Sequence, residues 1–300
     1  MAHEKNIRVN TLIVGAARAG TTSLCHQLAQ HPEVCFSTQK EPPYFSIAEH
    51  YRKGPEFLHD FFEHCKGEPV VATADTYLFI HHKAIARIAN YNPKMRIVIM
   101  LREPVARAYA SFQYAKNNGY EPASRDFITS MKLEQQELDK SNIQAYNNRA
   151  HLLTSMYHKH LEQWLSYFPH GCVKIFTLEK MKQQPQAFFN ELYNYLGISH
   201  QPIEAAPQKN AAQSARSGHL QQLLLNREHP VRRSLKRLLP ENIKKRLWQS
   251  GAIDKLKKLN AKPTDYPPIT DEEREVAEKY LAKDRAKFQR EFGELFPTGG

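Results

Sequence analysis

The chain carries a glycine-bounded loop whose residue types and spacing suit the binding of an anion. A short apolar run at 12–14 is typical of a buried strand, and Gly15 follows it directly. Gly20 closes the loop, and the helix expected behind it begins with the hydroxyl residues 21–23. Backbone N–H groups at the start of a helix point into such a loop, and the helix dipole favours negative charge there. The sequence therefore predicts a phosphate-binding loop with Arg18 inside it.

The residue after Gly20 distinguishes this loop from the loop of ATP- and GTP-binding proteins. Those proteins follow the pattern G-x-x-x-x-G-K-[ST], in which the lysine contacts the outer phosphates and the hydroxyl contacts magnesium. Here Thr21 stands where that lysine belongs, and the nearest cation is Arg18. The strand expected at 96–101 is followed by Arg102, where a magnesium-binding nucleotide hydrolase often has an aspartate. These residues favour an anion site that requires no metal over a site for ATP hydrolysis.

Several stretches of the sequence resemble a known family. They are GAARAGTTSLCHQLAQHPEV at 15–34, KEPPYFS at 40–46 and IVIMLREPVARAYASF at 97–112, with a weaker echo, YHKHLEQWLSYFP, at 157–169. The first stretch resembles the 5′-phosphosulfate loop of sulfotransferases that use 3′-phosphoadenosine 5′-phosphosulfate (PAPS). The branch that the chain most resembles is the bacterial carbohydrate-type group, which is related to the heparan sulfate sulfotransferase domains. The likeness covers about 12–197 and implies transfer of a sulfuryl group from PAPS.

The resemblance implies a donor site built on the loop. The residues that it assigns to the loop side of this site are Arg18, Ala19, Gly20, Thr21, Thr22 and Ser23. Arg18 stands at a basic position that is often lysine in relatives, and we expect it to stabilise charge on the leaving phosphate. Arginine does not act as a proton donor, so this role is electrostatic. Arg102 falls where the family places an arginine on the 3′-phosphate, although its residue type also suits a surface arginine at a sheet edge.

The remainder of the expected 3′-phosphate site departs from the family pattern. The family has a serine eight residues after the arginine, but position 110 here is alanine and the serine is Ser111. One helical step turns a side chain by about 100°, so Ser111 reaches the phosphate only if the helix shifts. A third element, Arg216, Ser217 and Gly218, lies where relatives place a loop that closes over the 3′-phosphate.

Glu41, in the stretch KEPPYF, is the expected general base. In the heparan sulfate enzymes that the chain resembles, an acidic residue ahead of a similar aromatic pair is assigned to deprotonating the acceptor hydroxyl. A well-placed general base accelerates such a step roughly 10²–10⁴-fold. Two alternatives stay open at this point. Glu41 could pair with Lys40 or Arg52 and only fix the loop, or Asp75 could be the base.

The elements that must position these residues alternate between strands and helices. Strands are expected at 7–14, 34–36, 70–73, 96–101 and 173–178. Helices are expected at 21–30, 50–64, 83–89, from 104 onward, and at 124–139, 152–168, 186–196 and 271–292. This alternation predicts an α/β fold, a P-loop-like three-layer domain with a mostly parallel central sheet. Ligands bind beyond the carboxyl ends of such strands, and Arg18, Asp75 and Arg102 all follow strands there.

Length and charge bound the organisation and the partners. The 300 residues are expected to form one sulfotransferase domain, with a core at about 7–198 and a helical, basic C-terminal extension at 199–300. The net charge of +11 predicts an anionic partner. A nucleotide donor accounts for part of it, and an acidic glycan or lipid for more. No zinc spacing or RNA-binding signature supports nucleic acid as the partner.

The basic segment Arg232–Lys258 has leucines at helical spacing. It suits either the solvated face of a packing helix or a surface for acidic lipid or polysaccharide, and hence a peripheral membrane contact. The four cysteines, at 25, 35, 65 and 172, lie far apart and read as reduced thiols. No stretch approaches the ~18 apolar residues of a membrane span. Together with an N-terminus that lacks an apolar leader, these features lead us to expect a cytoplasmic protein.

The sequence thus predicts a PAPS-dependent sulfotransferase that acts by in-line transfer and needs no metal. The expected acceptor is a hydroxyl of a sugar or glycolipid in preference to an amine. One alternative is a non-catalytic polyanion-binding protein on the same fold. The other is an ATP-using P-loop kinase, which Thr21 disfavours. The segments 49–64 and 123–148 are expected to shape the acceptor site, and their residues favour no single substrate.

Overall fold

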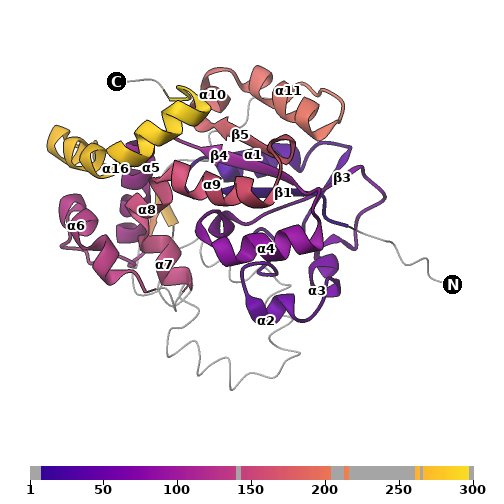
Figure 1. Cartoon of the computed structure of the whole chain (residues 1–300), viewed down its shortest axis with the longest axis horizontal. Helices are drawn as coiled ribbons and strands as arrows, with labels where there is room; N and C mark the ends of the chain where they lie inside the picture. Colours follow the sequence, from indigo (N-terminus) through magenta and orange to yellow (C-terminus); the bar gives the residue numbers. More distant parts are fainter. Residues whose placement is uncertain (1–7, 140–142, 204–212, 216–260, 264–265, 297–300) are drawn as a thin grey trace. The chain divides into compact units, whose positions relative to one another are not determined.

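The computed structural model describes residues 8–139, 143–203, 213–215, 261–263 and 266–296 (Figure 1). The chain divides into two compact units. The first comprises Met1–Arg107, Leu152–Lys209 and Glu278–Gly300, and the second comprises Ala108–His151 and Asn210–Ala277. The expectation of a single domain over the whole chain stays a prediction.

A five-stranded sheet forms the centre of the first unit. Its strands are β1 (Thr11–Gly15), β2 (Val34–Phe36), β3 (Val70–Ala74), β4 (Arg96–Leu101) and β5 (Val173–Thr177). They lie in the order β2-β3-β1-β4-β5, and every neighbouring pair is parallel. In β1 every residue is buried, as expected for a strand covered on both faces. The predicted α/β fold with a parallel sheet is confirmed.

Helices cover the sheet on both faces. Those of the first unit are α1 (Thr21–Leu28), α2 (Ala48–Tyr51), α3 (Glu56–His59), α4 (His82–Tyr91), α9 (Tyr157–Tyr167), α10 (Leu178–Gln183) and α11 (Pro185–Leu196). Short 3-10 turns lie between helices and strands: η1 (Asp60–Phe62) between α3 and β3, η2 (Thr76–Ile80) between β3 and α4, and η3 (His170–Cys172) between α9 and β5. The connection through α1 runs from β1 to β2, on one side of β1, and the connection through α4 runs from β3 to β4, on the other side. Because such parallel connections are right-handed, α1 and α4 lie on opposite faces of the sheet. Figure 1 shows α4 and α9 packed together in front of the strands.

The described residues of the second unit are mainly helical. This unit contains α6 (Phe127–Glu137), α7 (Ile143–Arg149) and an antiparallel pair of short strands, β6 (Gln213–Ala215) and β7 (Ala261–Pro263). The sequence analysis did not predict this strand pair. Three helices contain residues of both units: α5 (Pro104–Asn117), α8 (His151–Ser155) and α16 (Asp271–Phe292).

Two of the predicted helices are interrupted. The helix expected at 50–64 breaks at Gly54, which has a φ of +89°, and Pro55 precedes α3. Glycine at such an angle ends a helix without steric cost. The helix expected at 152–168 breaks before α9, whose first N–H groups, at His158 and Lys159, donate to the Asp284 carboxylate at 3.0 Å. A capping acid more than a hundred residues away gives no local signal in the sequence.

The cysteine prediction is wrong for one pair. Cys35 and Cys65 form a disulfide, whereas Cys25 and Cys172 are free thiols. The chain between the bridged residues folds back on itself, since the Thr38 N–H donates to the Phe61 carbonyl at 3.0 Å. This return brings together two cysteines that the sequence places 30 residues apart. Among the helices of the described residues, none has the length and apolar character needed to cross a membrane.

Candidate active site

The loop after β1 turns sharply and leads directly into the N-terminus of α1. Arg18 and Gly20 have φ angles of 71° and 85°. A Cβ atom at Gly20 would lie 2.6 Å from Cδ1 of Leu178, the end of a flexible side chain, so the φ angle is the stronger reason for glycine at this position. Within the described residues no side chain caps the N-terminus of α1, which starts directly after Gly20. The backbone donors of the first turn and the helix dipole therefore favour an anion at this point.

A buried arginine that the sequence analysis did not single out supports the loop from behind. Arg107 is 1% exposed, and its Nη1 donates to the Ala17 carbonyl at 3.3 Å. Its Nε donates to the Ser155 hydroxyl at 2.7 Å, and this hydroxyl in turn donates to the Pro104 carbonyl at 2.7 Å. The only sequence signal for this role was an arginine among apolar residues at the start of a helix. The loop thus rests on a rigid polar support.

The predicted loop residues differ in exposure. Arg18 and Thr22 are exposed, Gly20 and Ser23 are half-buried, and Thr21 is only 5% exposed. The Thr22 hydroxyl accepts a hydrogen bond of 3.0 Å from the Lys40 ammonium. Thr22 is therefore the hydroxyl that faces the segment after β2, whereas the Thr21 side chain is packed inside.

Glu41 lies at the carboxyl end of β3, beside this loop. Its N–H donates to the Ala74 carbonyl at 2.9 Å, and its φ of 60° turns the chain there. The Thr76 hydroxyl donates to Glu41 Oε1 at 2.7 Å, and Lys40 Nζ lies 4.0 Å from the same oxygen. The Glu41 side chain is 27% exposed. A carboxylate that is held on one side and open on the other can accept a proton from a ligand.

Asp75, the alternative base, has a different environment. It is 2% exposed, and its Oδ1 accepts from the Tyr77 N–H at 3.1 Å, which caps η2. A buried capping carboxylate is poorly placed to meet a substrate hydroxyl. Of the two acidic residues, the geometry favours Glu41.

Arg102 follows β4 and is fixed through its backbone. The Tyr157 hydroxyl donates to the Arg102 carbonyl at 2.7 Å. The next residue, Glu103, accepts from the N–H groups of Val105 and Ala106 at 3.2 and 2.7 Å and so caps α5. The Arg102 side chain remains partly exposed. Because β1 lies between β3 and β4, the structure brings Arg18, Glu41 and Arg102 to one edge of the sheet.

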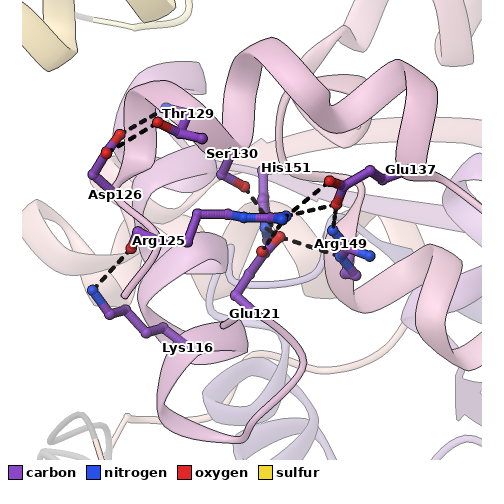
Figure 2. Close-up of polar contacts among 9 residues, drawn as sticks. All are labelled: Lys116, Glu121, Arg125, Asp126, Thr129, Ser130, Glu137, Arg149 and His151. Atoms are coloured by element: carbon purple, nitrogen blue, oxygen red, sulfur yellow. Dashed lines mark hydrogen bonds and ion pairs between the residues drawn. The ribbon is translucent and has the colours of Figure 1, made fainter. Parts of the chain in front are cut away.

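Ser111 belongs to the second unit and is engaged in a buried network there. It is 5% exposed, and its hydroxyl lies 2.9 Å from Nδ1 of His151. Nε2 of His151 lies 3.3 Å from Oε1 of Glu121. Figure 2 shows how Arg125 and Arg149 reach this carboxylate, at 3.0 and 3.3 Å. The contact of Ser111 with a 3′-phosphate stays a prediction, and its hydroxyl already has a protein partner.

Two predicted features cannot be placed. Arg216, Ser217 and Gly218 lie outside the described residues, and so does the basic segment Arg232–Lys258. Their expected contacts, with the 3′-phosphate and with an acidic surface, stay predictions.

Comparison with known proteins gives the family. Residues 8–238 match the family model described as Sulfotransferase domain, and the chain therefore belongs to the sulfotransferase family. It is similar to the bifunctional heparan sulfate N-deacetylase/N-sulfotransferase 2 of Bos taurus, with 28% identity over 201 residues, 63% of this chain and 22% of that protein. It is also similar to the heparan sulfate glucosamine 3-O-sulfotransferase 5 of Mus musculus, with 29% identity over 158 residues, 53% and 44% of the two chains.

The chain thus spans less than half the length of these curated relatives. Among solved structures, a sulfotransferase from Alicyclobacillus acidocaldarius superposes with a TM-score of 0.66 over 95% of both chains, at 19% identity. This likeness shows that the two proteins share a fold.

Proposed function

We propose that the protein transfers a sulfuryl group from PAPS to an acceptor hydroxyl. The observation that carries this proposal is the position of the Lys40–Glu41 pair against the loop, where Lys40 touches Thr22 and Glu41 lies 4.0 Å from the same ammonium. An anion-binding turn and a part-exposed carboxylate next to it are the two components that sulfuryl transfer to a hydroxyl requires.

The donor fits the residues at this edge of the sheet. When bound, PAPS supplies an activated sulfuryl group on its 5′-phosphate. The uncapped N-terminus of α1 and residues 18–23 would hold that phosphate, and Arg102 would hold the 3′-phosphate. Arg18 and Arg102 supply the positive charge that magnesium supplies in ATP-dependent P-loop proteins. The proposal therefore requires no metal.

Glu41 carries the proton transfer in this scheme. Its carboxylate takes the proton of the acceptor hydroxyl while the acceptor oxygen bonds to sulfur. Arg18 stabilises the electron pair that stays on the phosphate oxygen as the bond from sulfur to that oxygen breaks. Fixed charges aimed at developing charge are usually the largest catalytic contribution. Thr76 keeps Glu41 oriented through the 2.7 Å hydrogen bond.

The acceptor class follows from the relatives and the charge. Both relatives named above are heparan sulfate enzymes by their names, and the net charge of +11 suits an acidic polymer. We therefore propose a carbohydrate or glycolipid as the acceptor, with the segment 49–64 at its binding site. The first relative is by its name an N-sulfotransferase and the second a 3-O-sulfotransferase; the part-exposed Glu41 carboxylate, which suits removal of a hydroxyl proton, favours a hydroxyl.

The test is transfer of radiolabelled sulfate from PAPS to a panel of heparosan, heparan sulfate, chondroitin and a glycolipid. We expect labelling of at least one acceptor, and Glu41→Gln should lower turnover roughly 10²-fold or more with bisphosphate affinity unchanged. The exposed acid Glu162 provides the matched control, since Glu162→Gln should leave turnover unchanged. Binding of acidic polymers without any transfer would instead support a non-catalytic polyanion-binding protein.

A further inference from the structure

A second cation stands beside the phosphate-binding loop, and it comes from a different part of the chain. Lys40 belongs to the segment after β2, yet its Nζ lies 3.0 Å from Oγ1 of Thr22, in the first turn of α1. This hydroxyl is at the end of the helix where an anion is favoured. A change of side-chain rotamer would therefore bring the ammonium to a phosphate bound at this helix end.

The backbone that carries Lys40 is fixed to the sheet. Before it, the Ser37 N–H donates to the Ala72 carbonyl at 3.0 Å, and after it, the Glu41 N–H donates to the Ala74 carbonyl at 2.9 Å. Pro42 next to it is buried. The side chain itself is 39% exposed, so it keeps freedom to turn from Thr22 to a ligand. A fixed backbone combined with a flexible four-carbon side chain lets the ammonium move toward a bound anion.

Lys40 and Arg102 belong to chain segments on opposite sides of the loop. The Lys40 segment is bonded to the end of β3, and Arg102 follows β4, while β1 with the loop lies between these two strands. Two cations on opposite flanks suit the two separate phosphates of a 3′,5′-bisphosphate. Since Lys40 contacts the start of α1, we assign Lys40 to the 5′-phosphate of the bisphosphate.

We propose that Lys40 is a catalytic residue that binds the 5′-phosphate end of the donor and assists its departure. The inference rests on the proposed sulfuryl transfer and adds a residue to it. As the bond from sulfur to the bridging oxygen breaks, its electron pair stays on that oxygen. Lys40 keeps its proton and donates a hydrogen bond there, whereas the acceptor proton goes to Glu41. Lys40 thus shares with Arg18 the stabilisation of the negative charge that develops on that oxygen.

The test is calorimetric titration of the full chain with three nucleotides. These are 3′,5′-bisphosphoadenosine, AMP with only the 5′-phosphate, and adenosine 3′-monophosphate with only the 3′-phosphate. Lys40→Met should lower the affinity for the bisphosphate and for AMP roughly 10- to 100-fold, the range for one charge-assisted hydrogen bond. The affinity for the 3′-monophosphate should not change. Lys40→Arg should recover part of this loss. Arg102→Ala should show the reverse, losing the bisphosphate and the 3′-monophosphate but not AMP.

Lys94 is the matched control, because it is exposed and precedes β4 at the opposite edge of the sheet. Lys94→Met should bind all three nucleotides like the wild type. If the wild type binds the bisphosphate but Lys40→Met does too, or loses all three nucleotides equally, the role of Lys40 is overturned while the proposed function stands. If the wild type binds none of the three, the proposed function fails and the role of Lys40 with it.

Discussion

The Thr76 hydroxyl donates a 2.7 Å hydrogen bond to Oε1 of Glu41 and thereby ties the segment after β2 to the turn after β3. Thr76 is itself only 7% exposed, so the bond is sheltered from water. A carboxylate oriented in this way loses little freedom when it receives a proton from a ligand. The orientation of the proposed base thus depends on a neighbour outside its own sequence motif.

Removing that hydroxyl should reduce turnover without affecting donor binding. We expect Thr76→Val to lower kcat roughly 10-fold, the order of effect of a lost orienting hydrogen bond of about 1.4 kcal/mol. Thr76→Ser keeps the hydroxyl and should remain close to the wild type. Steady-state transfer and calorimetric titration with the bisphosphate separate the two effects. If Thr76→Val lowers the bisphosphate affinity as much as kcat, the role of Thr76 is to stabilise the phosphate-binding loop and not to orient Glu41.

Arg107 should be needed for both stability and donor binding. Arg107→Met removes the bonds to Ala17 and Ser155 and should lower the free energy of unfolding by roughly 2–4 kcal/mol. The same substitution should also lower the affinity for the bisphosphate, because the Ala17 carbonyl that Arg107 contacts is part of the phosphate-binding loop. Lysine lacks the guanidinium fork, so Arg107→Lys should rescue little. Urea unfolding checks the stability, with the exposed Arg290→Met as control. Wild-type stability in Arg107→Met would refute the supporting role.

The strong signals in the sequence were those within one element. The apolar run of β4 and the glycine-bounded turn before α1 were predicted at their observed positions, because each depends on residues next to one another. The helix expected at 186–196 was also predicted correctly, and it ends at Leu196 before Gly197, which has a left-handed φ of 67°. The terminal helix at 271–292 was predicted too, and Thr270 and Glu273 at its start exchange hydrogen bonds at 2.9 and 3.2 Å.

What the sequence could not supply were contacts between distant segments. Nothing in the residues near Lys40 indicates that it reaches Thr22. The choice between Glu41 and Asp75 likewise needed the burial of Asp75, which depends on how β3 continues into η2. The sequence analysis did not single out Arg107, because its partners Ser155 and Ala17 lie 48 and 90 residues away in the chain. These features arise from tertiary packing, which a linear pattern records only indirectly.

The Cys35–Cys65 disulfide should stabilise the segment that carries Lys40 and Glu41. The bridge spans 30 residues, and closing a loop of that length in the unfolded chain is worth roughly 3–4 kcal/mol in the chain-entropy model. We expect Cys35→Ser/Cys65→Ser, and the wild type under a dithiol reductant, to show this loss in urea unfolding. Cys25→Ser/Cys172→Ser, which keeps the bridge, is the control. If reductant leaves the wild type unchanged, the bridge contributes no stability.

The network in the second unit should make stability depend on pH. Burial raises the pKa of the Glu121 carboxyl, but the His151 hydrogen bond and the Arg149 charge outweigh it and lower the pKa from 4.5 to about 2. A carboxyl with a lowered folded-state pKa contributes stability above its unfolded value, and this contribution is lost as the pH falls toward 2. Figure 2 shows His151 and Arg149 beside the Glu121 carboxylate.

Glu121→Gln should therefore lower stability at neutral pH and flatten its decline between pH 5 and pH 2. Urea unfolding across this range measures both effects, and Glu162→Gln, an exposed acid, should follow the wild-type curve. If Glu121→Gln loses stability with the same acid slope as the wild type, another group is responsible for the acid dependence.

The most direct test of the central claim is a calorimetric titration of the full chain with 3′,5′-bisphosphoadenosine, run beside ATP with and without magnesium. Thr21 in place of the P-loop lysine and the two arginines at the sheet edge predict tight, metal-independent binding of the bisphosphate and much weaker binding of ATP. A preference for ATP that requires magnesium would contradict the sulfotransferase account.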